Sequence, residues 1–390
     1  MARLTRAEAQ ERNRAKVLEA ARQEFAERGF RDAKIDEIAD RAELTRGAVY
    51  SNFPGKRALY FAVLADLAER APVIPAEEPA LTVREALGEV ARAWVTRLPL
   101  MTEDRHAPSR LGADLMPEIL ADETLHKPFA ELMRLNAILL GLSMERLRPP
   151  KEPDGRLVRL AGAALTVLQG AGQLAAAAPG FVDSFDVIRV CERLADLDLD
   201  DRWTVAPVIP DVRETDEPWS PPIIRDPMDG AAGGVSGGAS DGTADGGVDG
   251  DADGRADGRA DGGAARLGRD GVVAVLGVHR LSAAEEAVRA APPGAEVTAV
   301  VVTRTPAEVL PLARLVVAEV GTCLRQAFPK PAWPRLRIVY DESGALAAAA
   351  GVAEPGDMTE VAIRVRSGRI VLRAEGFGAC HAAASQRDRP

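Results

Sequence analysis

Apolar residues over roughly the first half of the chain recur every three or four positions, the spacing that builds amphipathic helices. This spacing predicts helices at about residues 5–28, 56–70, 82–98, 109–120, 122–147, 154–178 and 182–197. From residue 271 the pattern changes to short apolar runs that alternate with helical stretches, and the last two runs flank Ser367 and Gly368. Such alternation predicts an α/β layer that ends in a β-hairpin.

Residues 33–52 carry two short helical patterns separated by a brief break. Ile35, Ile38, Ala39 and Ala42 give the first pattern one apolar face, and Thr45 is a suitable N-cap for the second. Two short helices joined by a tight turn form a helix-turn-helix, whose second helix fits the DNA major groove. The other interpretation is an ordinary helical hairpin in a protein core.

The second helix of this motif carries groups that suit DNA. Gly47 lets the backbone approach the duplex, Arg46 can reach a base edge or a phosphate, and Tyr50 and Ser51 offer hydroxyls. The predicted DNA-contacting residues are Lys34, Thr45, Arg46, Gly47, Tyr50, Ser51, Asn52 and Lys56.

These motifs resemble the TetR family of bacterial transcriptional regulators. The matching segments are FAERGF, IDEIADRA and TRGAVYSNFPGKRALY, and with the first helix they cover about 70 residues. The resemblance implies a DNA-binding domain over residues 1–72. The chain departs from the family pattern at Ala33, Lys34, Glu43 and Arg57. We therefore expect Asp32 to cap the second helix, and Lys34 and Arg57 to add charge that suits phosphate.

The same resemblance implies a helical regulatory and dimerisation domain over residues 80–203. In this family the last two helices pair with their copies into a four-helix bundle, so a homodimer is implied on about residues 154–197. Plain packing within one chain is the alternative. The helices would also enclose an effector pocket, and the polar or aromatic candidates for it are Trp94, His106, Asn136, Gln169 and Gln173. Each of these could instead be a surface or interface residue.

Residues 204–270 are first rich in proline and then rich in glycine and aspartate, a composition that predicts a disordered linker. Residues 271–385 then resemble the second half of a thioredoxin or peroxiredoxin fold. The position of that fold's catalytic cysteine is occupied by residues 278–282, VHRLS, so a catalytically silent domain on a flexible tether is expected. The alternative is a thiol-based redox regulator or a peroxiredoxin-like enzyme, with Cys323 and Cys380 as the candidate thiols.

Composition and charge bear on which classes of protein and of site the chain can be. The net charge is −10, but residues 1–57 hold 13 Lys and Arg against 10 Asp and Glu, which suits a DNA-reading head on an acidic body. Three scattered cysteines are too few for a disulfide framework or a zinc site. No apolar run is long enough to predict a membrane span, and a reducing cytoplasm fits. No nucleophile–base pair or metal-ligand set is recognisable, so we expect no enzyme, cofactor or metal.

The sequence therefore predicts a multidomain fold: an all-α helix-turn-helix head, an α-helical dimerisation and ligand domain, a disordered linker and a C-terminal α/β thioredoxin-like domain. The predicted function is a ligand-responsive transcriptional repressor. It would bind a palindromic operator in double-stranded DNA as a homodimer and be released by a small-molecule effector.

Overall fold

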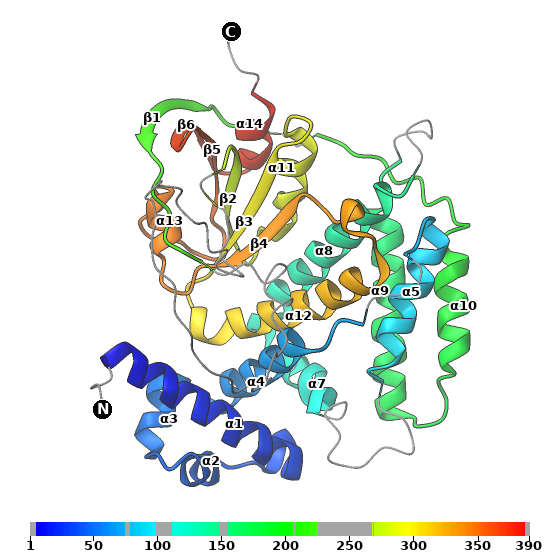
Figure 1. Cartoon of the computed structure of the whole chain (residues 1–390), viewed down its shortest axis with the longest axis vertical. Helices are drawn as coiled ribbons and strands as arrows, with labels where there is room; N and C mark the ends of the chain where they lie inside the picture. Colours follow the sequence, from blue (N-terminus) through cyan, green and yellow to red (C-terminus); the bar gives the residue numbers. More distant parts are fainter. Residues whose placement is uncertain are drawn as a thin grey trace, which may run out of the picture.

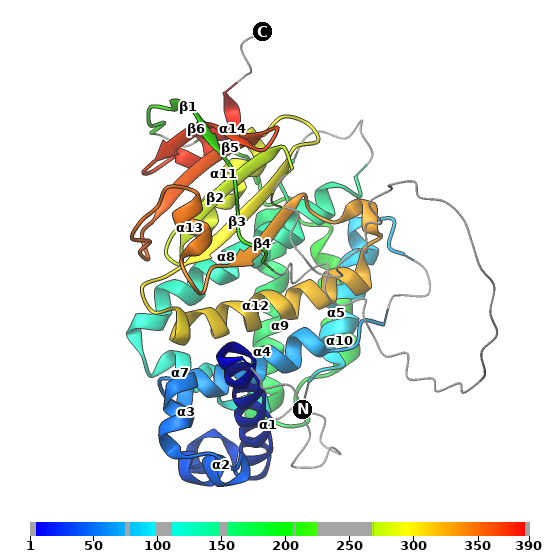
Figure 2. The same ribbon diagram turned by 60° about the vertical axis from the view of Figure 1, so that its left-hand side comes forward.

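The computed structural model describes residues 5–74, 79–98, 111–148, 155–205, 208–224, 267 and 269–386. A small helical head lies at one end of the molecule, and a helical body connects it to a six-stranded sheet (Figures 1 and 2).

The head contains α1 (Arg6–Asp32), α2 (Ile35–Arg41) and α3 (Arg46–Asn52). Thr5 is the N-cap of α1 and forms a capping box with Glu8. Its side chain accepts a hydrogen bond from the backbone N–H of Glu8, and the Glu8 carboxylate accepts one from the backbone N–H of Thr5. Inside the head, the carboxylate of Glu24 is fully buried and pairs with two arginines. A buried carboxylate needs such partners, and this one ties α1 to the end of α2 through Arg41.

Helix α4 (Lys56–Arg70) leaves the head and runs into the body, with the bounds that the apolar spacing predicts. Eight consecutive residues of α4, from Ala58 to Ala65, are buried, so it has neighbours on every side. The body continues with α5 (Val83–Val95), η1 (Gly112–Asp114), α7 (Leu115–Leu120), α8 (Glu123–Glu145), α9 (Val158–Ala177) and α10 (Ser184–Leu194). A Cβ added at Gly141 of α8 would lie 2.9 Å from the Cα of Val158, so glycine allows α8 and α9 to approach closely.

The sheet has the strand order β1-β6-β5-β2-β3-β4. Strands β2, β3 and β4 are parallel, whereas β5, β6 and β1 run antiparallel to their neighbours. The strands are β1 (Arg213–Pro218), β2 (Gly271–Gly277), β3 (Glu296–Val302), β4 (Leu336–Tyr340), β5 (Glu360–Arg366) and β6 (Arg369–Glu375). The helices of this part are η3 (Leu281–Ala283), α11 (Ala284–Ala290), α12 (Pro306–Ala327), η4 (Lys330–Ala332), α13 (Ala345–Ala349) and α14 (Ala379–Ser385). The predicted α/β layer and its hairpin are confirmed, while thioredoxin ancestry stays a hypothesis.

Side chains on the two faces of the sheet enter different cores. Ala274 and Ile338 face a core shared with α11, α12, α14 and the helical body. Val275 and Ile363 face a second, smaller core that α13 covers. Because successive residues of a strand point to opposite faces, the near-continuous apolar runs follow directly from burial on both sides.

The structure corrects the prediction of a linker over residues 204–270. Within it, β1 pairs with β6 as an edge strand, and its burial alternates only weakly. The indole of Trp219 is buried, and its Nε1 donates to the carbonyl of Leu267 at 2.7 Å. A strand rich in charged residues can form at a sheet edge because only one side needs backbone partners. The Gly/Asp-rich residues 225–266 lie outside the described residues.

The structure also shows that the C-terminal part is not loosely tethered. Helix α12 packs against α4, α5 and α8, so it lies in the middle of the helical body (Figure 2). Arg314 of α12 makes a two-pronged ion pair with Glu69 of α4, at 2.8 and 2.7 Å. The side chain of Asn136 on α8 donates to the carbonyl of Val316 at 2.8 Å. Head, body and sheet therefore share one continuous apolar core.

A second set of contacts joins the body to α11. Glu285 of α11 is 3 % exposed and accepts three hydrogen bonds of 2.6 Å, two from Arg156 and one from Arg289. Arg289 also donates to Glu145 at the end of α8, and Arg156 donates to Asp201. This alternating network of cations and carboxylates fixes α11 against α8 and α9.

Candidate nucleic-acid interface

Helix α3 exposes one face and buries the other. Its N-cap Thr45 accepts from the backbone N–H of Ala48 at 3.2 Å, and Val49 is buried at 1 % exposure. The opposite face carries the exposed residues Arg46, Gly47, Tyr50 and Ser51. Amphipathic spacing over only two turns thus holds α3 to the head while leaving a polar surface free.

Arg46 and Tyr50 form one surface group. The Arg46 guanidinium lies 5.6 Å from the centre of the Tyr50 ring and 3.3 Å from a carboxylate oxygen of Asp36 on α2. The neighbouring Tyr50 and the Asp36 carboxylate raise the pKa of Arg46, so its positive charge is secure. An exposed arginine beside an aromatic hydroxyl can donate to a base edge or a phosphate.

Gly47 and Glu43 are the two positions where backbone geometry bears on this surface. A Cβ at position 47 would meet only the Thr45 Oγ1, at 3.9 Å, so the fold itself does not require glycine there. Glu43, in the turn before α3, has φ of 56°, a left-handed conformation that is unusual outside glycine. The turn therefore forms despite the glutamate, and Lys16 of α1 lies 3.4 Å from its carboxylate.

Ser51 and Asn52 use their polar groups within α3. The Ser51 hydroxyl and the Asn52 amide each donate to the carbonyl of Ala48 at 2.8 Å. Arg14 of α1, which sequence reasoning missed, donates to the carbonyl of Asn52 at 3.4 Å and lies over the Phe53 ring. The sequence alone does not reveal this contact, because it forms only when α1 and α3 pack together.

The structure corrects the expected cap of α2 and gives two of the basic residues partners within the protein. Asp32 does not cap α2, because Lys34 is the N-cap residue and makes no side-chain cap hydrogen bond. Lys56 donates to the carbonyls of Arg31 and Ala33 at 3.0 and 3.1 Å, so two of its three donors hold the head together. Arg57 pairs with Asp122 at 2.7 Å and links the head to α8. Lys34 itself is exposed.

The predicted effector contacts lie in different environments. Trp94 on α5 and Asn136 on α8 are buried, whereas Gln169 and Gln173 lie on the outer side of α9. The Asn136 amide is already bonded to α12, and its Oδ1 is a buried acceptor without a partner in the described part of the chain. His106 lies outside the described residues. Helix α12 packs against α5 and α8, two of the helices that the sequence predicts to enclose the effector.

Residues 17–63 match the sequence model of the bacterial regulatory proteins of the tetR family. The chain is 39 % identical over 108 residues to the HTH-type regulator TtgW of Pseudomonas putida, an uncharacterized protein, and covers 73 % of it. The chain belongs to the TetR family.

Other TetR relatives match over a smaller share of their length. The regulator SrpR of Pseudomonas putida is also 39 % identical over 108 residues, but the chain covers only 46 % of it. Among solved structures, a TetR transcriptional regulator from Rhodococcus sp. RHA1 is 20 % identical with a TM-score of 0.32, over 48 % of this chain and 95 % of that one. This protein is thus a TetR-family transcriptional regulator with an α/β region added after the helical body.

Proposed function

We propose that this TetR-family regulator is a homodimeric, ligand-responsive repressor in the cytoplasm that binds a palindromic operator through α3. The exposed face of α3 carries the proposal, because it offers Arg46, Tyr50 and an unobstructed Gly47. A palindrome presents the same groups twice, about 34–36 Å apart, so a two-fold dimer would place one α3 in each of two successive major grooves.

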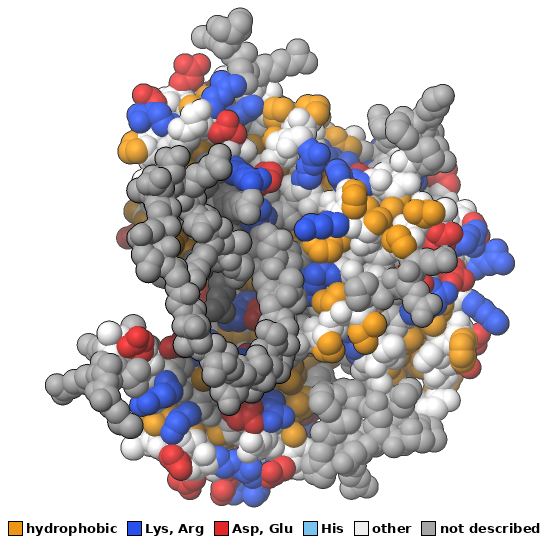
Figure 3. All heavy atoms as spheres, in the orientation of Figure 1, with side chains coloured by type: hydrophobic (Ala, Val, Ile, Leu, Met, Phe, Trp, Pro, Cys, Tyr) orange, Lys and Arg blue, Asp and Glu red, His pale blue; other side chains and the backbone are white. Residues whose placement is uncertain are grey.

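An uncovered apolar surface on α9 and α10 supports the dimer. Phe181, before α10, and Phe185 in its first turn are 72 % and 74 % exposed. Leu174 of α9, Val190 of α10 and Leu197 after it are also exposed, and Figure 3 shows hydrophobic side chains on this side of the molecule. Such a surface marks an interaction site. Among the described helices, α9 is the one with the length and composition of a membrane span, and 39 % of its apolar stretch is buried, but a second copy of this surface explains its apolar face equally.

Helix α12 offers a route from the added α/β region to the DNA. It contacts α4, which begins in the head, and the Arg314–Glu69 ion pair fixes the two helices together. A ligand that favours one position of α12 would shift α4 and change the separation of the two heads. Because α12 fills the space between α4, α5 and α8, the effector is proposed to act through α12 or beside it.

Replacing Arg46 or Tyr50 with alanine should weaken binding to the operator by about 1–3 kcal/mol each, as the loss of a base or phosphate contact does. The operator can be isolated by selection from random duplexes, and affinity measured by fluorescence anisotropy. Arg22→Ala on α1, which removes an exposed arginine paired with Glu19, is the matched control and should bind as the parent does.

Gly47→Ala separates DNA contact from folding. Alanine favours a helix over glycine by about 0.5–1 kcal/mol, so the variant should be at least as stable as the parent while its operator affinity falls. Unchanged affinities in Arg46→Ala, Tyr50→Ala and Gly47→Ala would show that α3 is not the reading helix.

Gly170→Phe should prevent dimerisation. A Cβ at Gly170 meets no atom within 4 Å, so one chain accepts the side chain, whereas a second copy packed on α9 would not. Light scattering at micromolar concentration should report a monomer that binds the operator poorly. Gly112→Phe, at an equally open position in η1, should remain dimeric. A dimeric Gly170→Phe protein would move the interface away from α9.

The redox alternative receives no support from the thiols. Cys191, Cys323 and Cys380 are all buried, and burial raises the pKa of each, to about 11 for Cys191. A thiol that stays protonated is a poor nucleophile, so these positions do not resemble an activated cysteine.

A further inference from the structure

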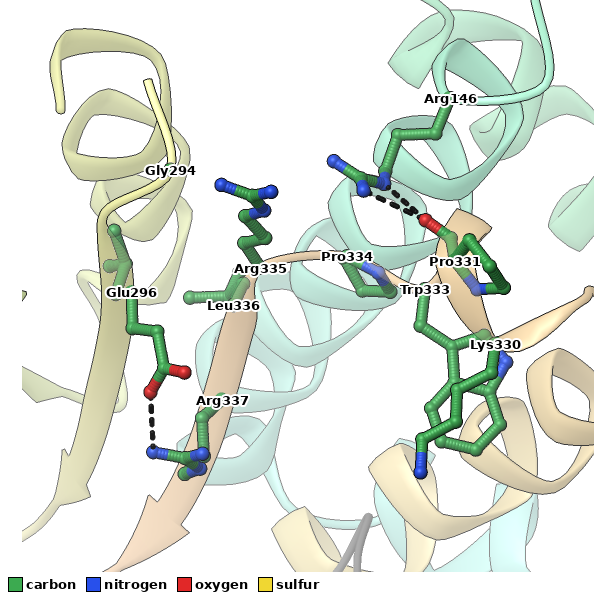
Figure 4. A pocket seen from close by; sticks show the side chains of 11 residues that line it. Arg146, Gly294, Glu296, Lys330, Pro331, Trp333, Pro334, Arg335, Leu336 and Arg337 are labelled. Atoms are coloured by element: carbon green, nitrogen blue, oxygen red, sulfur yellow. Dashed lines mark hydrogen bonds and ion pairs between the residues drawn. The ribbon is translucent and has the colours of Figure 1, made fainter. Parts of the chain in front are cut away.

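A hollow of about 440 Å³ lies where the helical body meets the sheet. The end of α8 contributes Arg146, η4 contributes Lys330, and the starts of β3 and β4 contribute Glu296, Arg335 and Arg337 (Figure 4). Trp333 and Pro334 add apolar surface. Three separate segments of the chain therefore converge on one depression, and four of its side chains are cationic.

The cations in this hollow are poorly balanced by carboxylates. Glu296 is the one acidic residue among those that line it, and it lies 3.5 Å from both Arg269 and Arg337. Among the described residues, no carboxylate lies within ion-pair distance of Arg146, Lys330 or Arg335. This excess is local, because the whole chain has a net charge of −10.

Arg146 lies at the rim of the hollow and is affected by a neighbouring cation. Its Nε and Nη2 donate to the carbonyl of Pro331 at 3.0 and 2.7 Å, which holds the guanidinium at the rim. Burial and the like charge of Arg335 lower the pKa of Arg146. Figure 4 shows the Arg335 side chain in the gap between Gly294 and Arg146. Two positive groups that repel one another across a gap become favourable partners once an anion lies between them.

We propose that this hollow binds a small anion carrying two or more negative charges, such as a phosphorylated or polycarboxylate metabolite, held by Arg146, Lys330 and Arg335. Arginine pairs bind phosphate and carboxylate oxygens in two-pronged fashion, and three cations from two segments of the chain favour a ligand with more than one charge.

The position of the hollow connects it with regulation. Lys330 lies three residues after the end of α12, and Arg146 follows α8, so an anion between them would draw together the ends of two packed helices. Since α12 also contacts α4, occupancy of the hollow would reach the head. This regulatory step rests on the proposed function, whereas anion binding itself does not.

Calorimetric titration of the full chain, without DNA and at low ionic strength, tests the site. Inorganic pyrophosphate and citrate are the probes, and they distinguish phosphate from carboxylate ligands. We expect saturable binding of at least one probe, weakened about tenfold or more in Arg335→Ala and in Lys330→Ala, since each removes a charged donor. Arg304→Ala, an exposed arginine just beyond the other end of β3, should bind as the parent does.

Two results would overturn the site: no saturable binding of either anion, or equal affinity in the parent, Arg335→Ala and Lys330→Ala. Neither side chain makes a described ion pair or hydrogen bond, so thermal melting of these variants should match the parent and loss of folding cannot mimic the effect. Operator binding is then measured with the bound probe. An anion that binds through Arg335 but leaves operator affinity unchanged would refute the regulatory link alone.

Discussion

A chain that lacks residues 271–390 is expected to lose its folded helical body together with the sheet. The truncation removes α12, whose buried side chains include Leu312, Val316 and Val320. Leaving one such side chain exposed costs about 1.5–3 kcal/mol, so losing several is comparable with the whole stability of a typical domain, about 5–15 kcal/mol. Circular dichroism melting and size-exclusion chromatography should show an aggregated or partly unfolded chain.

The complementary measurement restores α12 from a separate fragment. Residues 1–224 and 267–390, produced together, should form a stable complex, because α12 packs against α4, α5 and α8. If the truncated chain instead stays monodisperse, melts cooperatively at the temperature of the parent and keeps its operator affinity, the body does not depend on α12. That outcome would mean that residues 271–390 form a domain separable from the helical body.

Glu285→Gln is expected to destabilise the fold by about 3 kcal/mol, the lower end for breaking a buried ion pair. The carboxylate accepts three short hydrogen bonds from Arg156 and Arg289, whereas a glutamine amide would turn donors toward one of them. The lower value applies because Asp201 and Glu145 still pair with the two arginines.

Urea unfolding followed by circular dichroism measures this loss as a lower midpoint. The control is Glu342→Gln, which makes the same chemical change at an exposed carboxylate 3.4 Å from Arg314. Exposed pairs contribute about 0–1 kcal/mol, so the control should unfold close to the parent. Equal midpoints for the two variants would mean that the Glu285 network adds nothing beyond a surface pair.

The head could be read from the sequence because its determinants are local. The spacing of Ile38 and Ala39, the cap at Thr45 and the apolar Val49 each act within one or two helical turns. The protein partners of Lys56 and Arg57 could not be predicted, for the opposite reason. Their partners, Arg31, Ala33 and Asp122, lie elsewhere in the sequence, and charge alone does not reveal a tertiary contact.

The packing of α12 could not be predicted in the same way. Its apolar spacing indicates burial, but periodicity does not say which surface covers a helix. The Gly/Asp-rich composition before the sheet favoured a tether, whereas the docking is decided by Asn136, Arg314 and the apolar faces of α4 and α8. Strand β1 could not be predicted, because its sequence RETDEP has no apolar alternation and its pairing with β6 depends on an available sheet edge.

The place of α12 in the body also constrains how the protein is made. Helices α4, α5 and α8 leave the ribosome well before α12, which follows the first three strands of the sheet in chain order. Segments synthesised first normally fold first, but here their shared groove stays open until translation has passed residue 327. The growing chain therefore exposes apolar helices during much of its synthesis. Its folding should depend on the supply of chaperones and on ribosome pausing while the Gly/Asp-rich segment is translated.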